Sequence, residues 1–310
     1  MKFHKILWMT VLCAIFTAAG CTSIKNGLYN MAVNHECRKA DLASKRIAVN
    51  EIKFAFLEST PGSECPTLIM VHGFAASKEN WIRLAGHLTD SFHVIAIDLP
   101  GHGESTKDPA LSYDIDDQVG YLKTILTHLG LERFHMVGNS MGGAIISLYA
   151  ASYPEQVKSL FLIDPAGIYD YESELFSRLR GGKNPLIVEE RKDFYELMAF
   201  AMEKEPFIPW PVKSVMAERA VANNVINKKI FSEIRGDHDY DFKAELQNVT
   251  APAMILWGRE DRVIHWKNAS VFNRLIPASE TIILDGIGHA AMIEAPAKTA
   301  EIFKAFVARQ

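Results

Sequence analysis

Short apolar runs alternate with helix-length amphipathic segments along most of this chain, and this alternation limits the folds open to it. A short apolar run between turn-forming residues is typical of a strand buried on both faces. Strands that alternate with helices predict a mostly parallel central sheet with helices on both faces, the α/β class. Residues 47–57 instead alternate apolar and polar side chains, which predicts an antiparallel hairpin at one edge. The predicted strands lie at 67–71, 94–97, 134–137, 160–163, 253–257 and 281–284, and the predicted helices at 81–88, 115–129, 142–153, 267–275 and 297–308.

One long segment, residues 166–247, contains no buried-strand run. Its helical candidates lie at 173–179, 189–202 and 212–234. We therefore expect a core of residues 46–165 and 248–310, with a helical cap inserted before the strand at 253–257.

The first residues have the features of an export signal. A basic opening (Lys2 to Lys5) precedes an apolar stretch that ends in small residues before Cys21. This ending resembles a bacterial lipobox, in which the cysteine after the cut becomes a lipidated N-terminus. The resemblance implies a signal peptide at 1–20, a membrane anchor through lipidation of Cys21, and a place in the bacterial cell envelope. Thr22 after the cysteine favours the outer membrane; the alternative is an uncleaved signal anchor.

Residues 21–45 are mixed and polar, which favours a tether or a short helix leading to the folded body. Cys37 and Cys65 would pair in an exported protein only if their Cα atoms lay within about 7 Å. The sequence leaves that disulfide open.

The composition excludes several other classes of protein. The 310 residues carry 33 Lys and Arg against 37 Asp and Glu, a formal net charge of −4. The hydrophobic fraction of 48% excludes intrinsic disorder. Because phosphate binding needs a surplus of basic residues, we expect no nucleic-acid partner.

A candidate nucleophile stands where the strand at 134–137 meets the next helix. The sequence Gly138-Asn-Ser-Met-Gly-Gly143 fits the G-x-S-x-G pattern of a strained turn that exposes a serine hydroxyl. Small residues beside the serine let neighbouring backbone pass close by, and the helix N-terminus favours developing negative charge. We therefore predict that Ser140 is a catalytic nucleophile.

A serine nucleophile needs a histidine to take its proton and an acid to orient that histidine. We favour His289 as the base because it follows the last predicted strand, where a loop can reach the serine. The other two histidines after the serine fit less well. His238 lies in the inserted segment, and His265 is too close in sequence to the predicted acid.

For the acid, the expected chain order is serine, acid, histidine. Asp261 follows the strand at 253–257 and is our choice. Asp164, at the end of the preceding strand, is the rival, and we expect it to cap a turn before Pro165.

The oxyanion of an acyl-transfer intermediate needs two fixed N–H donors. Met141, directly after the nucleophile, supplies one backbone N–H. Phe74, in the loop after the strand at 67–71, supplies the other. His72 in the same loop then shapes it and is not a base.

Two further polar clusters are considered as phosphate-binding or metal-binding sites. Residues 98–105 are interpreted as a tight turn, because they lack the glycine spacing and the following lysine of a phosphate loop. Residues 237–241 offer metal-ligand types but are interpreted as a solvated loop. We expect no cofactor and no metal.

Taken together, these motifs make residues 46–308 resemble the α/β-hydrolase superfamily. They occur in the order His72-Gly-Phe74, Asp98-Leu-Pro-Gly-His-Gly103, Gly138-Asn-Ser-Met-Gly-Gly143, Trp257-Gly-Arg-Glu-Asp261 and Gly288-His289. Three more are similar to bacterial family V lipases and to the monoacylglycerol-lipase branch of animal proteins: Asp164-Pro-Ala-Gly167, Phe231-Ser-Glu-Ile234 and His289-Ala-Ala-Met-Ile-Glu294. The resemblance implies hydrolysis of acylglycerol esters, a mobile helical cap and no cofactor.

The sequence therefore predicts a serine carboxylic-ester hydrolase, a lipase or esterase that works through an acyl-enzyme. Large apolar side chains in the predicted cap either accommodate an acyl chain or simply cover the sheet edge. Two alternatives remain. One is a carbon–carbon bond hydrolase of ring-cleavage products, which usually acts in the cytosol. The other is an inactive hydrolase scaffold that binds a ligand, although such scaffolds usually lack a catalytic residue.

Overall fold

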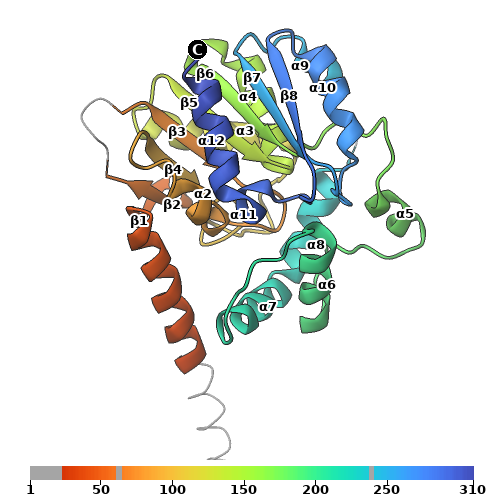
Figure 1. The fold of residues 1–310 in the computed structure, drawn as a ribbon. Helices are drawn as coiled ribbons and strands as arrows, with labels where there is room; N and C mark the ends of the chain where they lie inside the picture. Colours follow the sequence, from red (N-terminus) through yellow and green to blue (C-terminus); the bar gives the residue numbers. More distant parts are fainter. Residues whose placement is uncertain (1–22, 61–64, 237–240) are drawn as a thin grey trace, which may run out of the picture.

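The computed structural model describes residues 23–60, 65–236 and 241–310. Its centre is an eight-stranded sheet in the order β1-β2-β4-β3-β5-β6-β7-β8 (Figure 1). The strands are β1 Leu42–Val49, β2 Ile52–Ser59, β3 Thr67–Val71, β4 His93–Ile97, β5 Phe134–Asn139, β6 Val157–Ile163, β7 Ala253–Gly258 and β8 Ser279–Leu284. The predicted buried strands correspond to β3 through β8, so their positions are confirmed.

Strand directions follow the prediction of a mostly parallel sheet with an antiparallel edge. Strands β3 to β8 are parallel, whereas β1 pairs antiparallel with β2, and β2 pairs antiparallel with β4. Asn50 and Glu51 form the tight turn of the hairpin, both with positive φ. The first strand begins at Leu42, earlier than expected. Leu42 is buried, but the next residues, 43–45, are all exposed and show no apolar alternation that would predict a strand.

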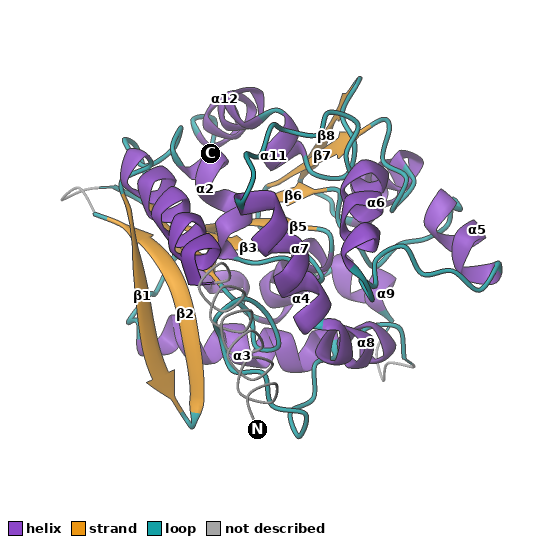
Figure 2. Cartoon of the chain, turned by 90° about the horizontal axis from the view of Figure 1, so that it is seen from below, coloured by secondary structure: helices purple, strands orange, loops and turns teal. Residues whose placement is uncertain are grey.

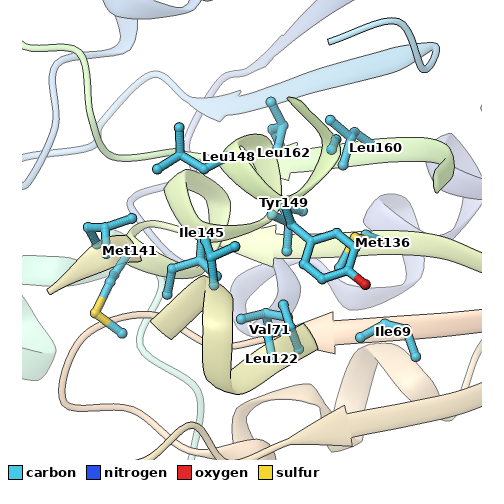
Figure 3. Close-up of a cluster of buried hydrophobic side chains, with 14 of the residues drawn as sticks. Ile69, Val71, Leu122, Met136, Met141, Ile145, Leu148, Tyr149, Leu160 and Leu162 are labelled. Atoms are coloured by element: carbon cyan, nitrogen blue, oxygen red, sulfur yellow. The ribbon is translucent and has the colours of Figure 1, made fainter. Parts of the chain in front are cut away.

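Helices cover both faces of the sheet, as predicted. They are α2 Ile82–Ala85, α3 Ile115–His128, α4 Met141–Ser152, α10 Ala269–Leu275, α11 Ala291–Glu294 and α12 Pro296–Val307. In β3, Ile69 and Val71 point into a core with α3 and α4, and Leu68 and Met70 into a second core with α2 and α12. Figure 3 shows the first core, where α4 side chains meet those of β3, β5 and β6.

The segment between β6 and β7 is helical. Its helices are α5 Glu174–Arg180, α6 Arg191–Ala201, α7 Val212–Ala222, α8 Asn224–Glu233 and α9 Phe242–Leu246. Seen from below, α6, α7 and α8 lie in front of the sheet (Figure 2). A small core of Val188, Phe194 and Ala217 joins α6 to α7. Helix α9 instead contacts α4 and α10.

Two predicted helices differ in extent. The one expected at 212–234 is interrupted at Asn223, which separates α7 from α8. The one expected at 81–88 consists of a 3₁₀ turn, Lys78–Trp81, and the single turn of α2. Gly86 follows α2, and glycine is a poor helix former.

Residues 23–39 form a helix that projects from the folded body below β1 (Figure 1). The guanidinium of Arg219 in α7 lies 4.0 Å from the ring centre of Tyr29. Tyr29 and Cys37 are buried. The sequence predicts a tether or a short helix at 21–45, and residues 23–39 form a helix.

The predicted signal peptide and its lipidation site, Cys21, lie outside the described residues. Within the described residues, no helix combines the length and the apolar character needed to cross a bilayer. Cys37 and Cys65 are free thiols.

Candidate active site

Ser140 occupies the sharp turn between β5 and α4. Its backbone has φ 54° and ψ −121°, a conformation that residues with a side chain rarely adopt. A Cβ on Gly138 would lie 2.5 Å from the carbonyl oxygen of Gly142, and a Cβ on Gly142 would lie 2.1 Å from that of Val71. Both positions therefore require glycine, which is the physical reason for the G-x-S-x-G pattern. Ser140 also lines a cavity at this edge of the sheet.

The loop after β3 lies directly against this turn. A Cβ on Gly73 would be 3.1 Å from the Cβ of Ser140, and Phe74 follows Gly73. Met141 is the first residue of α4, so its N–H has no acceptor within the helix. Phe74, Ser140 and Met141 line the same cavity. The two predicted oxyanion donors are thus brought to the serine from two separate elements.

His72 fixes the shape of this loop. Its Nδ1 donates to the carbonyl oxygen of Gly73 at 2.8 Å, and its Nε2 accepts from the N–H of Leu99 at 3.1 Å. Both ring nitrogens are occupied and burial lowers the pKa of His72, so this side chain is neutral and structural. The ring of His102 lies 4.9 Å from that of His72 and meets Phe74 edge-on at 6.4 Å.

The predicted base and acid are in direct contact. His289 Nδ1 donates to Asp261 Oδ2 at 2.7 Å, and both side chains are buried. The same oxygen accepts from Trp257 Nε1 at 3.1 Å, while Asp261 Oδ1 accepts the backbone N–H groups of Val263 and Ile264 at 2.8 and 3.0 Å. Because a carboxylate only accepts, Nδ1 carries a proton, and in the neutral imidazole the lone pair is then on Nε2.

Asn139 joins the His289 loop to the nucleophile turn. Its Nδ2 donates to the carbonyl oxygens of His289 and Ile163 at 3.0 and 3.1 Å. The His289 N–H donates to Ala201, at the end of α6, at 2.7 Å. The Ser140 hydroxyl makes no hydrogen bond to a described residue. Such catalytic contacts commonly tighten only when substrate binds.

Asp164, the rival acid, is buried beside the pair. Its Oδ1 accepts from the N–H of Gly258 at 2.8 Å, rather than capping the turn before Pro165. Its Oδ2 has no partner among the described residues. One ligand atom each from Asp164, Asp261 and His289 lie within 4.8 Å of one another. Burial, reinforced by Asp261, raises the pKa of Asp164 well above its usual value.

These three side chains are of types that can bind a divalent cation. The imidazole nitrogen facing the acids already donates to Asp261, and both Asp261 oxygens accept N–H groups, so the arrangement fits a hydrogen-bonded network better than a metal site. In the other candidate cluster, residues 237–240 lie outside the described chain. Asp241 accepts from the N–H groups of Lys243 and Ala244 and caps α9. The expected absence of a metal stays a prediction.

The turn at 98–105 is held together by a buried ion pair. Lys78 Nζ lies 2.9 Å from Asp98 Oδ2, and the same oxygen accepts the N–H of Glu104 at 2.8 Å. A Cβ on Gly103 would lie 2.1 Å from the Asp98 carboxyl. The Asp98 carboxyl fills the space inside this turn, so the turn cannot cradle a phosphate, in agreement with the sequence interpretation.

A cavity of about 290 Å³ opens at Ser140. Its lining is mostly apolar and includes residues of the helical segment between β6 and β7: Phe74, Met141, Ala166, Tyr169, Leu175, Phe176, Leu186, Phe231, Ile234, Val263 and Ile264, with Gly236. Arg235 is the charged residue in this lining, and its guanidinium lies 5.1 and 5.5 Å from the ring centres of Phe176 and Phe231. The sequence analysis missed Arg235 because the cap brings it to the site from outside every motif.

Glu294 connects the His289 loop to the cap, a role that the sequence analysis also missed. Its carboxylate accepts the N–H groups of Glu203 and Lys204, just after α6, at 2.9 and 2.8 Å. It also accepts the N–H of Gly288 at 3.1 Å. One carboxylate therefore holds both the loop that carries His289 and the backbone just after α6.

Comparisons with known proteins identify the family of this chain. Residues 66–296 match the family described as alpha/beta hydrolase fold. Lipase 1 of Psychrobacter immobilis is 33% identical over 296 residues, which are 93% of this chain and 92% of that lipase. Monoacylglycerol lipase ABHD6 of Homo sapiens is 29% identical over 259 residues, 80% of this chain and 77% of that protein.

A solved structure extends the similarity to the whole chain. A membrane phospholipase A, described as a bacterial virulence factor, superimposes with a TM-score of 0.91 at 37% identity. The match covers 100% of this chain and 99% of that one. The sheet order, the strained serine turn and the similarity over 66–296 lead to one assignment: the chain belongs to the α/β hydrolase fold family.

Proposed function

We propose that this chain is a serine carboxylic-ester hydrolase in which Ser140 is the nucleophile, His289 the base and Asp261 the orienting acid. The observation that carries the proposal is the buried contact between Asp261 and His289, joined by Asn139 to the strained serine turn. Relatives that match almost the whole chain are lipases, which supports ester hydrolysis. The residue roles rest on geometry.

In this proposal His289 Nε2 takes the proton of Ser140 as Oγ attacks the ester carbonyl. The N–H groups of Met141 and Phe74 stabilise the oxyanion, and Asp261 stabilises the imidazolium. His289 then gives its proton to the departing alcohol, which leaves an acyl group on the serine. A water molecule, deprotonated by the same imidazole, attacks the acyl-enzyme. The carboxylic acid leaves, and the serine regains its proton.

The cavity supports an acyl group as the part of the substrate that is recognised. Its lining is apolar apart from Arg235 and a few polar atoms, and each buried CH₂ of an acyl chain contributes about 0.8 kcal/mol. We propose fatty-acyl esters of glycerol as the substrate class. One relative is named as a monoacylglycerol lipase and a similar structure as a phospholipase, so both glycerol and phospholipid head groups should be tested.

Covalent labelling tests the nucleophile assignment. We expect a fluorophosphonate probe to modify Ser140 of the purified protein, as located by peptide mass spectrometry. The Ser140→Ala variant should stay unlabelled, with the thermal unfolding curve of the wild type. Labelling at another residue, or none at all, would refute the assignment and would favour an inactive scaffold.

A substrate panel separates the remaining alternatives. It should contain p-nitrophenyl esters of increasing chain length, mono-, di- and triacylglycerols, a phosphatidylcholine and a ring-cleavage dienone. We expect turnover of the fatty-acyl esters and none of the dienone. Preference for C2–C4 esters would reduce the assignment from lipase to esterase. Turnover of the dienone alone would replace ester hydrolysis by carbon–carbon bond hydrolysis.

We also propose that residues 166–247 act as a cap over the serine. Cap residues Leu175, Phe176 and Phe231 line the cavity together with Ser140. Because they come from different cap helices, a movement of the cap would change the access of a substrate to the nucleophile.

The N-terminus supports a further part of the proposal, a lipid anchor on Cys21 after removal of residues 1–20. The helix at 23–39 would then begin next to the membrane, and the protein would be held in the bacterial cell envelope, at the outer membrane. Metabolic labelling with tritiated palmitate should label the wild type but not Cys21→Ser. Equal labelling of both, or an unprocessed wild-type chain, would contradict the anchor.

A further inference from the structure

The buried carboxyl of Asp164 has a free oxygen beside the proposed catalytic pair. The Asp164 and Asp261 side chains are both fully buried, and an oxygen of each lies within 4.8 Å of the other and of an imidazole nitrogen of His289. Oδ1 of Asp164 is held by the N–H of Gly258, whereas Oδ2 has no partner among the described residues. A buried polar atom without a partner is uncommon and calls for an explanation.

The backbone keeps this carboxyl in place. Asp164 has a positive φ of 47°, a strained conformation for a residue with a side chain. Its N–H donates to the carbonyl oxygen of Leu256 in β7 at 2.9 Å. Asp164 is thus fixed to β7 at two points, and it follows β6 directly. The free oxygen therefore belongs to a rigidly placed group.

We propose that Asp164 is a reserve acid for His289, a positioning residue that can replace Asp261 as the partner of imidazole Nδ1. This inference rests on the proposed function, because it concerns the same base. In the resting protein Asp261 carries the negative charge and Asp164 remains a neutral carboxylic acid, since two adjacent buried carboxylates do not readily ionise together. Loss of the Asp261 charge removes this obstacle. Asp164 then ionises, and Oδ2 accepts the Nδ1 proton of His289.

The charges around Asp164 are consistent with this exchange. Burial raises the pKa of Asp164, and the charges of Asp261, in the loop after β7, and of Glu294, in α11, raise this pKa further, whereas the hydrogen bond from the N–H of Gly258 lowers it. Glu294 binds backbone N–H groups at the edge of the cap and remains when Asp261 is replaced. Replacement of Asp261 therefore removes the charge that raises the pKa of Asp164 more strongly.

A double-mutant cycle on ester hydrolysis tests the proposal. The variants are Asp164→Asn, Asp261→Asn and the combination of both. Asparagine keeps an oxygen for the N–H of Gly258, so the structural contact of Asp164 survives while its ability to ionise is lost. In a triad with no second carboxylate to replace the acid, removal of the acid lowers kcat by about 10⁴-fold.

We expect Asp261→Asn to lose only about 10- to 100-fold in kcat, and the double variant about 10⁴-fold, close to a triad without any acid. Asp164→Asn alone should lower kcat less than tenfold. If Asp164 were purely structural, Asp164→Asn would lower kcat by the same factor in the wild type and in Asp261→Asn. Equal factors, or Asp261→Asn as inactive as the double variant, would overturn the proposal.

A spectroscopic measurement covers the case in which the double variant does not fold. An imidazole Nδ1 proton that is hydrogen-bonded to a buried carboxylate gives a low-field proton NMR resonance. We expect this resonance in the wild type and in Asp261→Asn, and its loss in His289→Gln. Its absence from a folded Asp261→Asn variant would overturn the proposal. This measurement does not depend on turnover, so it separates failure of the reserve acid from failure of the proposed hydrolase function.

Discussion

Replacement of Lys78 by methionine should destabilise the protein strongly, because it removes a cation buried against Asp98. The side chains of Lys78 and Asp98 are 1% and 0% exposed. Lys78 Nζ lies 2.9 Å from Asp98 Oδ2, 2.7 Å from Glu79 Oε1 and 3.2 Å from Glu104 Oε2. Methionine preserves much of the aliphatic length, so the substitution chiefly removes the charge.

The loss of one partner of a buried pair typically costs about 3–5 kcal/mol. The N–H groups of Lys78 and Glu104 also bind the Asp98 carboxylate at 2.7 and 2.8 Å and would remain in Lys78→Met. We therefore expect Lys78→Met to lower the free energy of unfolding by an amount at the lower end of this range, about 3 kcal/mol. A change of this size lowers Tm by about 5 °C or more in a domain of this length.

The effect should also depend on pH. Burial alone would raise the pKa of Asp98, but the ion pair with Lys78 more than offsets this and holds the pKa below its usual value. The pair therefore contributes stability above the unfolded pKa of 3.8, and this contribution is lost as the pH falls through the lower folded pKa. In Lys78→Met burial dominates, so the destabilisation should be larger at pH 8 than at pH 5.

Urea unfolding of wild type, Lys78→Met and Lys298→Met measures these differences. Lys298 and Glu301 form an exposed pair, at 54% and 69% exposure, and are the matched control. An exposed pair contributes less than about 1 kcal/mol. If Lys78→Met cost no more than Lys298→Met, the buried pair would not stabilise the turn at 98–105 and the reasoning would be wrong.

Two further predictions concern the support of the site. Burial lowers the pKa of His102 to about 3 from 6.5, so stability is fully present above pH 6.5 and declines as the pH falls toward 3. At pH 5 the loss is about 2 kcal/mol in the free energy of unfolding. His102→Asn should largely remove this difference between unfolding measured at pH 5 and at pH 7.5. An unchanged pH dependence in the variant would contradict the assignment. Glu294→Ala should release the His289 loop and lower kcat/KM about tenfold or more, because small displacements of a base reduce the rate steeply. Glu294→Gln, which keeps an acceptor, should lose less; wild-type kinetics in Glu294→Ala would exclude the clamp.

The sequence predicts the sheet and the serine turn well because both depend on local patterns. The strand at 67–71 agrees residue for residue with β3, since a short apolar run between Pro66 and Gly73 has no helical alternative. At the serine turn, a Cβ on Gly142 would collide with the backbone of Val71, so the glycine is dictated by sterics.

The remaining features depend on contacts between distant parts of the chain. Asn139 and His289 are 150 positions apart, and no local pattern indicates their hydrogen bond. The interruption between α7 and α8 at Asn223, and the position of Arg235 in the cavity lining, depend on how the cap helices pack. The sequence ranked Asp261 above Asp164, but only the fold shows that both carboxyls lie beside His289.

The hydrolysis of p-nitrophenyl esters by wild type and Ser140→Ala tests the central claim most directly. Ser140 should be the attacking group, so its removal should lower kcat by about 10⁶-fold while the unfolding transition is retained. Asn139→Ala, which keeps the nucleophile but frees the His289 loop, should retain measurable turnover. Hydrolysis by a folded Ser140→Ala protein at the wild-type rate would contradict the mechanism.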